Sequence, residues 1–267
     1  MTVNDEGFLS PDIAARVARH RSANPVAFQI ADDLNRILVE MLQHASPVKA
    51  NKRQLLVAVL FARAVEHFQC AVLLAQRGAV PSGKVLLRVL CDSAFAIRAC
   101  AKNNEYVDKI ILDDRVREKQ LLDALLSLPR EDVDVPPQEM KKLEARLAEL
   151  RAIIKADKQS VLKSIDTAVA GGLVDFYRLF YVPYSNVVHS AARDLDDHIN
   201  KDKDGDVESL RWGPDRARVE GVVSAAVQIA FAAANGHLAV FPSSRPEADL
   251  EKLWVRQKAY LQTQLPS

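Results

Sequence analysis

Polar side chains recur at helical spacing inside stretches of this chain that are otherwise apolar. Residues three, four, seven or eight positions apart share one face of a helix. Three such sets occur: Arg63 with Glu66, His67 and Cys70; Arg88 with Asp92; and Tyr181 with Ser185 and His189. If the three faces meet, Glu66 and Asp92 become partners for Arg88. His189 can then act as an acid or base, because histidine changes charge near neutral pH.

A structural interpretation of the same residues stays open, and we favour it. A charged group inside an apolar bundle is costly unless it is paired, and a buried ion-pair network fixes the register of the helices around it. We therefore expect Arg88 to be buried and paired with Asp92, Glu66 or both. The functional interpretation instead makes these residues a binding pocket for RNA or a small anion, formed by Arg63, Glu66, Arg88, Asp92 and Ser185.

The polar positions resemble a bacterial family of unknown function. The strings that carry the resemblance are Arg63-Ala-Val-Glu66, Leu86-Leu87-Arg88-Val-Leu-Cys-Asp92 and Tyr184-Ser185-Asn-Val-Val-His189-Ser190, within residues 30–240. Members of that family are cytosolic helical proteins, often found near mobile or defence genes, and usually carry Glu where this chain has Asp92. The resemblance implies an all-helical fold and the importance of these polar positions, and it implies no reaction.

A second motif, Arg193-Asp-Leu-Asp-Asp-His198, resembles the Arg-x4–6-His motif of HEPN domains. These domains are helical dimers that often cut RNA without a metal. The resemblance implies that Arg193 holds the phosphate and that His198 moves a proton on or off the 2′-hydroxyl. It also implies a homodimer, because one motif supplies only half of such a site. The alternative is an exposed arginine and histidine at the end of a helix.

Templates for metals and cofactors are absent or defective. The segment Asn200–Arg211 follows the EF-hand calcium template at several positions, but Arg211 stands where a bidentate Glu belongs. We predict a solvated acidic turn there, with a weak calcium loop as the alternative. The sequence holds no glycine-rich dinucleotide motif, no Walker A string, no HExxH and no GxSxG. We therefore expect neither a metal nor a cofactor.

Composition limits the class of protein and its compartment. The 267 residues include 37 Ala and 31 Leu but only 9 Gly, which favours helices over β-sandwiches or barrels. The formal net charge of +1 argues against electrostatic binding of nucleic acid or lipid by the whole surface of the protein. The acidic segment Met1–Gly7 is not a signal peptide, and charges or polar groups interrupt the apolar runs. With three unpaired cysteines, we expect a cytoplasmic protein that is not in a membrane.

Capping residues, prolines and glycines divide the chain into about ten helices. Helices are predicted near residues 11–20, 25–44, 50–77, 82–102, 105–127, 138–159, 173–191, 215–240 and 247–264, with a short one before Gly171. Those at 50–77 and 82–102 are apolar nearly all round, as expected of a central buried pair. Residues 105–159 are predicted to form a projecting antiparallel hairpin, the alternative being a helix on the main bundle. One short strand is expected at 207–212.

The sequence thus predicts an all-α multi-helix bundle, residues 1–267 forming one domain. Two functions stay open. One is a HEPN-like, metal-independent ribonuclease that uses Arg193 and His198, or Arg88 and His189. The other is a non-catalytic binding or scaffold protein with a buried polar network. An open pocket that exposes His189 or His198 would favour the ribonuclease, whereas enclosed and paired histidines would favour the scaffold.

Overall fold

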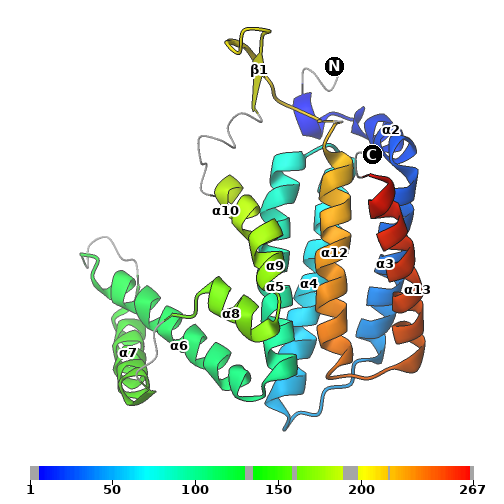
Figure 1. The fold of residues 1–267 in the computed structure, drawn as a ribbon. Helices are drawn as coiled ribbons and strands as arrows, with labels where there is room; N and C mark the ends of the chain where they lie inside the picture. The colour runs from blue at the N-terminus through cyan, green and yellow to red at the C-terminus, as the bar shows by residue number, and fades with distance from the viewer. Residues whose placement is uncertain (1–5, 130–134, 158–160, 189–197, 216, 265–267) are drawn as a thin grey trace.

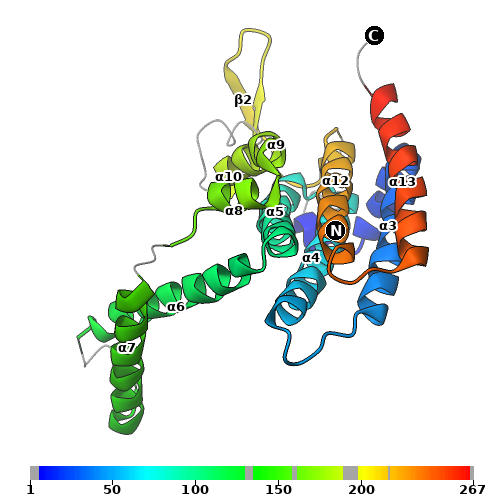
Figure 2. The same ribbon diagram turned by 60° about the horizontal axis from the view of Figure 1, so that its bottom comes forward.

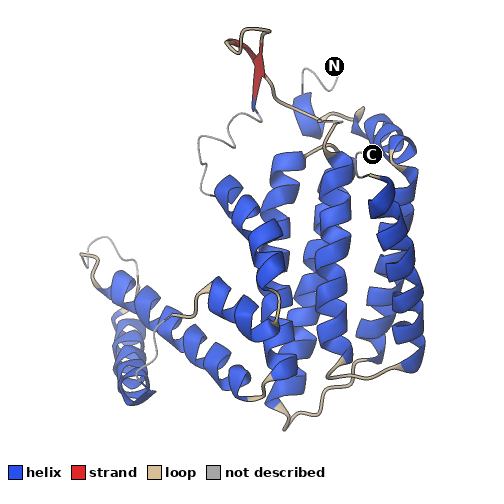
Figure 3. Ribbon diagram, viewed as in Figure 1, coloured by secondary structure: helices blue, strands red, loops and turns tan. Residues whose placement is uncertain are grey.

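The computed structural model describes residues 6–129, 135–157, 161–188, 198–215 and 217–264. Helices make up most of this structure and confirm the predicted all-α class (Figures 1 and 3). The long helices are α2 (Ile13–Ala23), α3 (Pro25–His44), α4 (Lys52–Gln76), α5 (Val80–Lys102), α6 (Glu105–Leu126), α7 (Pro137–Asp157), α12 (Val219–Leu238) and α13 (Ser244–Thr263). The shorter elements are η1 (Gly7–Leu9), α8 (Ser164–Gly171), α9 (Val174–Phe176), the π-helical turn η3 (Tyr177–Tyr181), α10 (Val182–Val188), β1 (Ile199–Lys201) and β2 (Val207–Leu210).

Local capping chemistry explains where α3, α4 and α5 begin and end. Pro25 occupies the first turn of α3, where its missing N–H costs no hydrogen bond. The Asn51 side chain accepts the N–H of Gln54 and caps α4. The turn between α4 and α5 needs Gly78, because its φ is +77° and a Cβ there would lie 2.9 Å from the backbone oxygen of Asp215. The backbone N–H of Asp215 donates to the Gly78 carbonyl, so a distant segment is held against this turn.

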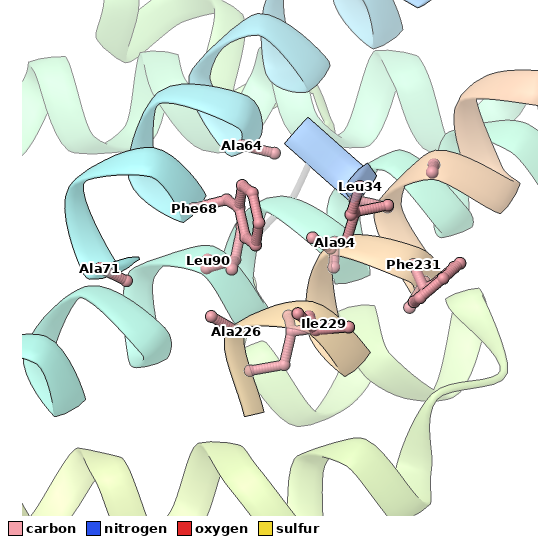
Figure 4. Close-up of a cluster of buried hydrophobic side chains, with 14 of the residues drawn as sticks. Leu34, Ala64, Phe68, Ala71, Leu90, Ala94, Ala226, Ile229 and Phe231 are labelled. Carbon is pink, nitrogen blue, oxygen red and sulfur yellow. The ribbon is translucent and has the colours of Figure 1, made fainter. Parts of the chain in front are cut away.

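The main core lies where α4, α5 and α12 pack together, with α3 and α13 outside them (Figure 1). Small residues let these helices approach closely, and aromatic rings fill the gaps between them. Figure 4 shows Ala64 and Phe68 of α4 beside Leu90 and Ala94 of α5 and Ala226 of α12. The burial predicted for residues 82–102 is confirmed in α5, which supplies much of this core.

The central buried pair predicted at 50–77 and 82–102 is only half right. By length and composition alone, α4 and α12 could each cross a membrane, but a buried core helix of a soluble protein meets the same criteria. The most apolar window of α12 is 72% buried, as expected of a core helix, whereas that of α4 is 33% buried. The prediction is wrong for α4 because its apolar residues surround the helix while its neighbours cover only one face.

Helices α6 and α7 project from the body, as predicted for residues 105–159 (Figures 1 and 2). They share a small apolar cluster of their own, made of Leu122, Leu147 and Leu150. The expected antiparallel packing is wrong, because α7 crosses α6 (Figure 2). Ion pairs join Glu118 to Arg146 and Asp123 to Arg151. The later residue of α6 thus pairs with the later residue of α7, which is the opposite of the order in an antiparallel hairpin.

This projecting pair should exchange its amide hydrogens faster than the core helices do. Its apolar cluster is small and separate from the main core, so local opening costs little free energy. Hydrogen exchange followed by mass spectrometry should show lower protection in α7 than in α12. Replacing the fully buried Leu150 with Ala should lower protection in α7 further and leave α12 unchanged. Equal protection of α7 and α12 in the unmodified protein would contradict this.

Candidate functional site

A polar network joins α5, α8 and η3 on one side of the core. Arg88 and Asp92 lie one turn apart on α5, and their side chains form an ion pair of 3.1 Å. The Ser164 hydroxyl donates to Asp92 at 2.8 Å and lies 2.9 Å from the Tyr181 hydroxyl. Arg88 also donates to the Tyr181 hydroxyl at 2.8 Å, and its guanidinium lies over the Tyr181 ring. The four side chains therefore close a ring of contacts that links three elements.

The pKa of Asp92 and the exposed fractions of the two side chains show that this network is partly buried. Burial raises the pKa of the Asp92 carboxyl, although the Ser164 hydrogen bond and the charge of Arg88 oppose the rise. The charges of Arg117 and Arg63 act in the same direction as that of Arg88. The side chains of Arg88 and Asp92 are 27% and 35% exposed, so the pair is half-buried. Such a network fixes the positions of α8 and η3 against α5.

The predicted Arg88–Asp92 pair is confirmed, but the three expected faces do not all meet. Arg88 is half-buried instead of buried, since it lies at the edge of the core. Arg63 and Glu66 are exposed on α4, and neither pairs with Arg88 in the described part of the chain. Glu66 is therefore wrong as a partner of Arg88. Glu66 is exposed on α4, although the charge of the nearby Arg63 still acts on Asp92 of α5.

Of the predicted set Tyr181, Ser185 and His189, the structure shows only part at the network. Tyr181 joins the network, and Ser185 is half-buried on α10. His189 lies outside the described residues. No sequence pattern predicted Ser164, which lies 72 positions from Asp92 and shares no helical spacing with it.

Breaking the Arg88–Asp92 pair should destabilise the protein moderately. We expect Arg88→Met to lower the free energy of unfolding by about 2 kcal/mol, less than the 3–5 kcal/mol typical of fully buried pairs, because both side chains are partly solvated. Urea denaturation of Arg88→Met, Asp92→Asn and the double variant would measure the coupling in a double-mutant cycle. A coupling energy of zero would show that the pair does not hold these elements.

A second candidate site is a cavity of about 640 Å³ beside the turn between α4 and α5. Its lining includes Ala79 from that turn, Pro81 from the first turn of α5, and Phe8 from η1. The side chains that could do chemistry come from the segment around the two strands: His198, Arg211, Trp212, Asp215 and Arg218. A volume of this size is within the range of small-molecule and cofactor pockets.

The β1–β2 hairpin brings His198 next to Arg211. The strands pair antiparallel with Ile199 opposite Leu210, which places His198 opposite Arg211 at the open end of the hairpin. The backbone N–H of Arg211 donates to the His198 carbonyl at 2.7 Å. Directly opposed residues in an antiparallel pair project to the same face. His198 and Arg211 are thus neighbours in the backbone pairing, both line the cavity, and both are exposed.

The rest of the cavity combines an ion pair with an exposed ring. Arg218 donates to Asp215 through two nitrogens at 2.9 and 2.6 Å. Burial alone would raise the pKa of Asp215, but the hydrogen bonds from Arg218 and from the Ala217 N–H, and the charges of Arg218 and Arg211, lower it overall. The positive charge of Arg211 therefore reaches into the cavity. Trp212 is 66% exposed and offers an open aromatic surface.

The structure changes the interpretation of the Arg-x4-His motif. His198 is exposed, as the ribonuclease hypothesis requires, and it directly precedes β1. The helical context that the HEPN resemblance implies falls on residues 189–197, which lie outside the described residues. Arg193 lies outside the described residues. The arginine that the structure places beside His198 is Arg211, which sequence reasoning treated only as a defect in a calcium template.

The hairpin also accounts for the segment that resembles a calcium loop. The predicted strand near 207–212 is confirmed as β2, whereas its partner β1 was not predicted. An Asp202 side-chain oxygen accepts the backbone N–H groups of Asp204 and Asp206 and closes the turn. Gly205 has a φ of +91°, which the turn requires. Residues that the calcium template assigns to one loop therefore lie on two paired strands.

Residues 54–206 match a family of unknown function (DUF5677), and because they make up more than half of the chain, the protein belongs to this family. The match confirms the expected membership in a helical family of unknown function. It runs from the first turn of α4 to the turn of the hairpin, so it includes Arg63, Arg88, Asp92 and His198 but not Arg211. Searches of curated proteins and of solved structures each found no match.

Proposed function

We propose that this protein is an RNA-binding, metal-independent ribonuclease of the cytoplasm whose site is the cavity around His198. One observation carries the proposal: His198 is exposed and lines one cavity together with Arg211 and the exposed Trp212. Histidine is the usual proton-transfer residue at neutral pH, arginine binds phosphate, and aromatic rings stack on unpaired bases. These are the three kinds of contact that a single-stranded RNA phosphodiester needs.

The reaction that fits these groups is attack by the neighbouring 2′-hydroxyl. The His198 imidazole would take the 2′-hydroxyl proton, and the 2′-oxygen would form a bond to phosphorus while the bond from phosphorus to the 5′-oxygen breaks. The 5′-oxygen would take its proton from water. Arg211 would hold the phosphate and offset the charge that develops on its oxygens. The products are a 2′,3′-cyclic phosphate and a 5′-hydroxyl.

Single-stranded RNA fits the cavity better than a small anion does. The volume of about 640 Å³ exceeds what one phosphate needs, and the exposed Trp212 ring has no function in binding a small anion. Recognition of RNA commonly relies on unpaired bases stacked on aromatic side chains. The overall charge of +1 means that affinity must come from this local site.

A non-catalytic binding or scaffold protein is the second candidate, and the Arg88–Asp92 network favours it. That network is half-buried and joined by hydrogen bonds to Ser164 and Tyr181, which is the arrangement of a structural element. Under this candidate the cavity would bind RNA or an anion without changing it.

The test is incubation of purified protein with labelled single-stranded RNA in an excess of chelator. We expect fragments that end in 2′,3′-cyclic phosphate, and no cleavage of the matched strand that has deoxyribose at every position. Fragments that end in a 3′-hydroxyl would contradict the proposed chemistry. A protein that binds the RNA and leaves it intact would support the scaffold candidate instead.

A further inference from the structure

The exposed face of α4 is unusual for a helix of its composition. The best 18-residue window of α4 is more apolar than that of α12, yet only 33% of it is buried. Leu55, Val59 and Leu73 are 48%, 59% and 52% exposed. Large apolar side chains that line one face of a helix mark an interaction surface when no part of the same chain covers them.

The residues along this face follow a heptad seam. Starting at Lys52, alternate steps of four and three residues give the series Lys52, Leu56, Val59, Arg63, Glu66, Cys70, Leu73 and Arg77. All of these residues are exposed or half-buried, and Leu56 lies at the edge where the face meets the main core. A repeat of 3.5 residues is the spacing by which one helix packs along another. The face is therefore built to contact a helix, in addition to the face that packs against α5 and α12.

We propose that this face is the interface of a homodimer, in which α4 packs antiparallel against α4 of a second copy about a two-fold axis between residues 64 and 65. In a two-fold interface, each residue meets the residue equally far on the other side of the axis. This rule places Leu56 opposite Leu73, Val59 opposite Cys70, and Arg63 opposite Glu66. Two apolar layers on each side thus enclose a central pair of reciprocal ion pairs.

Charge complementarity selects a second copy as the occupant. Arg63 and Glu66 are exposed, and neither forms a salt bridge with another described residue, although the charge of Arg63 also acts on Asp92. In the antiparallel arrangement, Arg63 of each copy faces Glu66 of the other copy, which gives two ion pairs. A parallel arrangement would place Arg63 against Arg63, which is repulsive. A membrane would leave both charges in hydrocarbon at the middle of the face, which is costly.

The outermost layer is compatible with this arrangement. Lys52 and Arg77 carry like charges and would lie opposite each other, but they are at the solvated ends of the helix pair. Lys52 also has an acidic neighbour in its own chain, Asp108, at 3.5 Å. Like charges at a solvated rim are screened and weaken an interface little.

The interface is separate from the RNA site and does not rest on the proposed function. The His198 cavity adjoins the C-terminal end of α4, at the turn that contains Ala79. In an antiparallel pair, the two cavities lie at opposite ends of helices of 25 residues, or about 37 Å along the axis. Each copy therefore keeps its own site, in contrast to the composite site that the HEPN resemblance implies.

Charge reversal tests the central layer. Light scattering after size-exclusion chromatography should show a dimer for the unmodified protein. Arg63→Glu alone and Glu66→Arg alone should each shift it toward monomer, because each places like charges together at the axis. The two reversals combined should restore the dimer. Circular dichroism should be unchanged throughout, since both side chains are exposed. A monomeric unmodified protein, or a dimer that is indifferent to the single reversals, would overturn the proposal.

Cross-linking tests the register. Val59→Cys should place a thiol opposite Cys70 of the second copy and give a covalent dimer on mild oxidation. The matched control is Val59→Cys combined with Cys70→Ser, which should stay uncross-linked because two copies of position 59 lie far apart. Cross-linking of the control would overturn the register. Binding of a monomer to phospholipid vesicles that is lost in Leu73→Glu would assign the face to lipid and overturn the proposal.

Discussion

Replacing His198 with alanine is expected to lower RNA cleavage by roughly 100-fold to 10,000-fold while leaving the fold intact. Removal of a positioned proton-transfer group typically costs that much. The fold should survive because His198 is exposed and contributes its backbone carbonyl, not its side chain, to the hairpin. Initial rates on single-stranded RNA in chelator would measure the loss.

The matched control for this variant is His44→Ala, which removes an exposed histidine at the end of α3. Its cleavage rate should equal that of the unmodified protein. Arg211→Ala should weaken RNA binding and slow cleavage, whereas Arg245→Ala, which removes an exposed arginine on α13, should do neither. Cleavage that persists in His198→Ala would remove this residue from the mechanism.

The second large effect concerns stability in mild acid and rests on His237. This residue of α12 is 2% exposed and is stacked between the rings of Phe61 and Phe241, at centroid distances of 4.1 and 4.8 Å. Neither ring nitrogen has a hydrogen-bond partner among the described residues. Burial lowers the pKa of His237 to about 4. The core therefore accepts the neutral imidazole and rejects the charged one.

The direction of the pH dependence follows from this lowered pKa. Well above pH 6.5 the imidazole is neutral in both the folded and the unfolded chain. The lowered pKa then has no effect on the free energy of unfolding. Between that pH and about 4 the unfolded chain binds a proton that the folded chain does not bind, so the free energy of unfolding falls as pH falls. The full loss is about 3 kcal/mol, at 1.36 kcal/mol per pKa unit.

Urea denaturation at about pH 7 and about pH 5 would measure this dependence. His237→Phe should remove most of it, because phenylalanine fits between the same two rings and cannot be protonated. His44→Ala should retain it, since His44 is exposed. An equal fall in stability in His237→Phe would assign the acid sensitivity to other groups.

The helix boundaries could be predicted from the sequence because the signals that begin or end a helix are local. Pro25, Asn51 and Gly78 each act on the backbone within a few residues of their own position. The Arg88–Asp92 pair was predictable for the same reason, since both residues lie on one helix. Ser164 was not, because only the packing of α8 against α5 brings it to Asp92.

The hairpin shows how a local signal can be assigned to the wrong template. Asp204-Gly205 is a common hairpin turn, and the acidic residues around it also match a calcium loop. Strand β1 has only three residues, too few for an alternating pattern. The neighbouring positions of His198 and Arg211 depend on the register of this hairpin and could not be predicted without it.

The exposed face of α4 shows a different limit. An apolar residue contributes equally to hydropathy whether the same chain, a second copy or nothing covers it. The helix was therefore predicted to be buried on all sides. Only the arrangement of α5 and α12 around α4 shows which of its apolar residues this chain covers.

The central claim is that the cavity around His198 binds a single-stranded nucleic acid through its phosphate. The most direct test is nuclear magnetic resonance of the six histidine side chains during titration with a single-stranded oligodeoxynucleotide in chelator, since this ligand lacks the 2′-hydroxyl and is not cleaved. The His198 resonance, assigned from its absence in His198→Ala, should shift saturably, and the shift should be lost in Arg211→Ala. A His198 resonance that does not move when the strand binds would contradict the account.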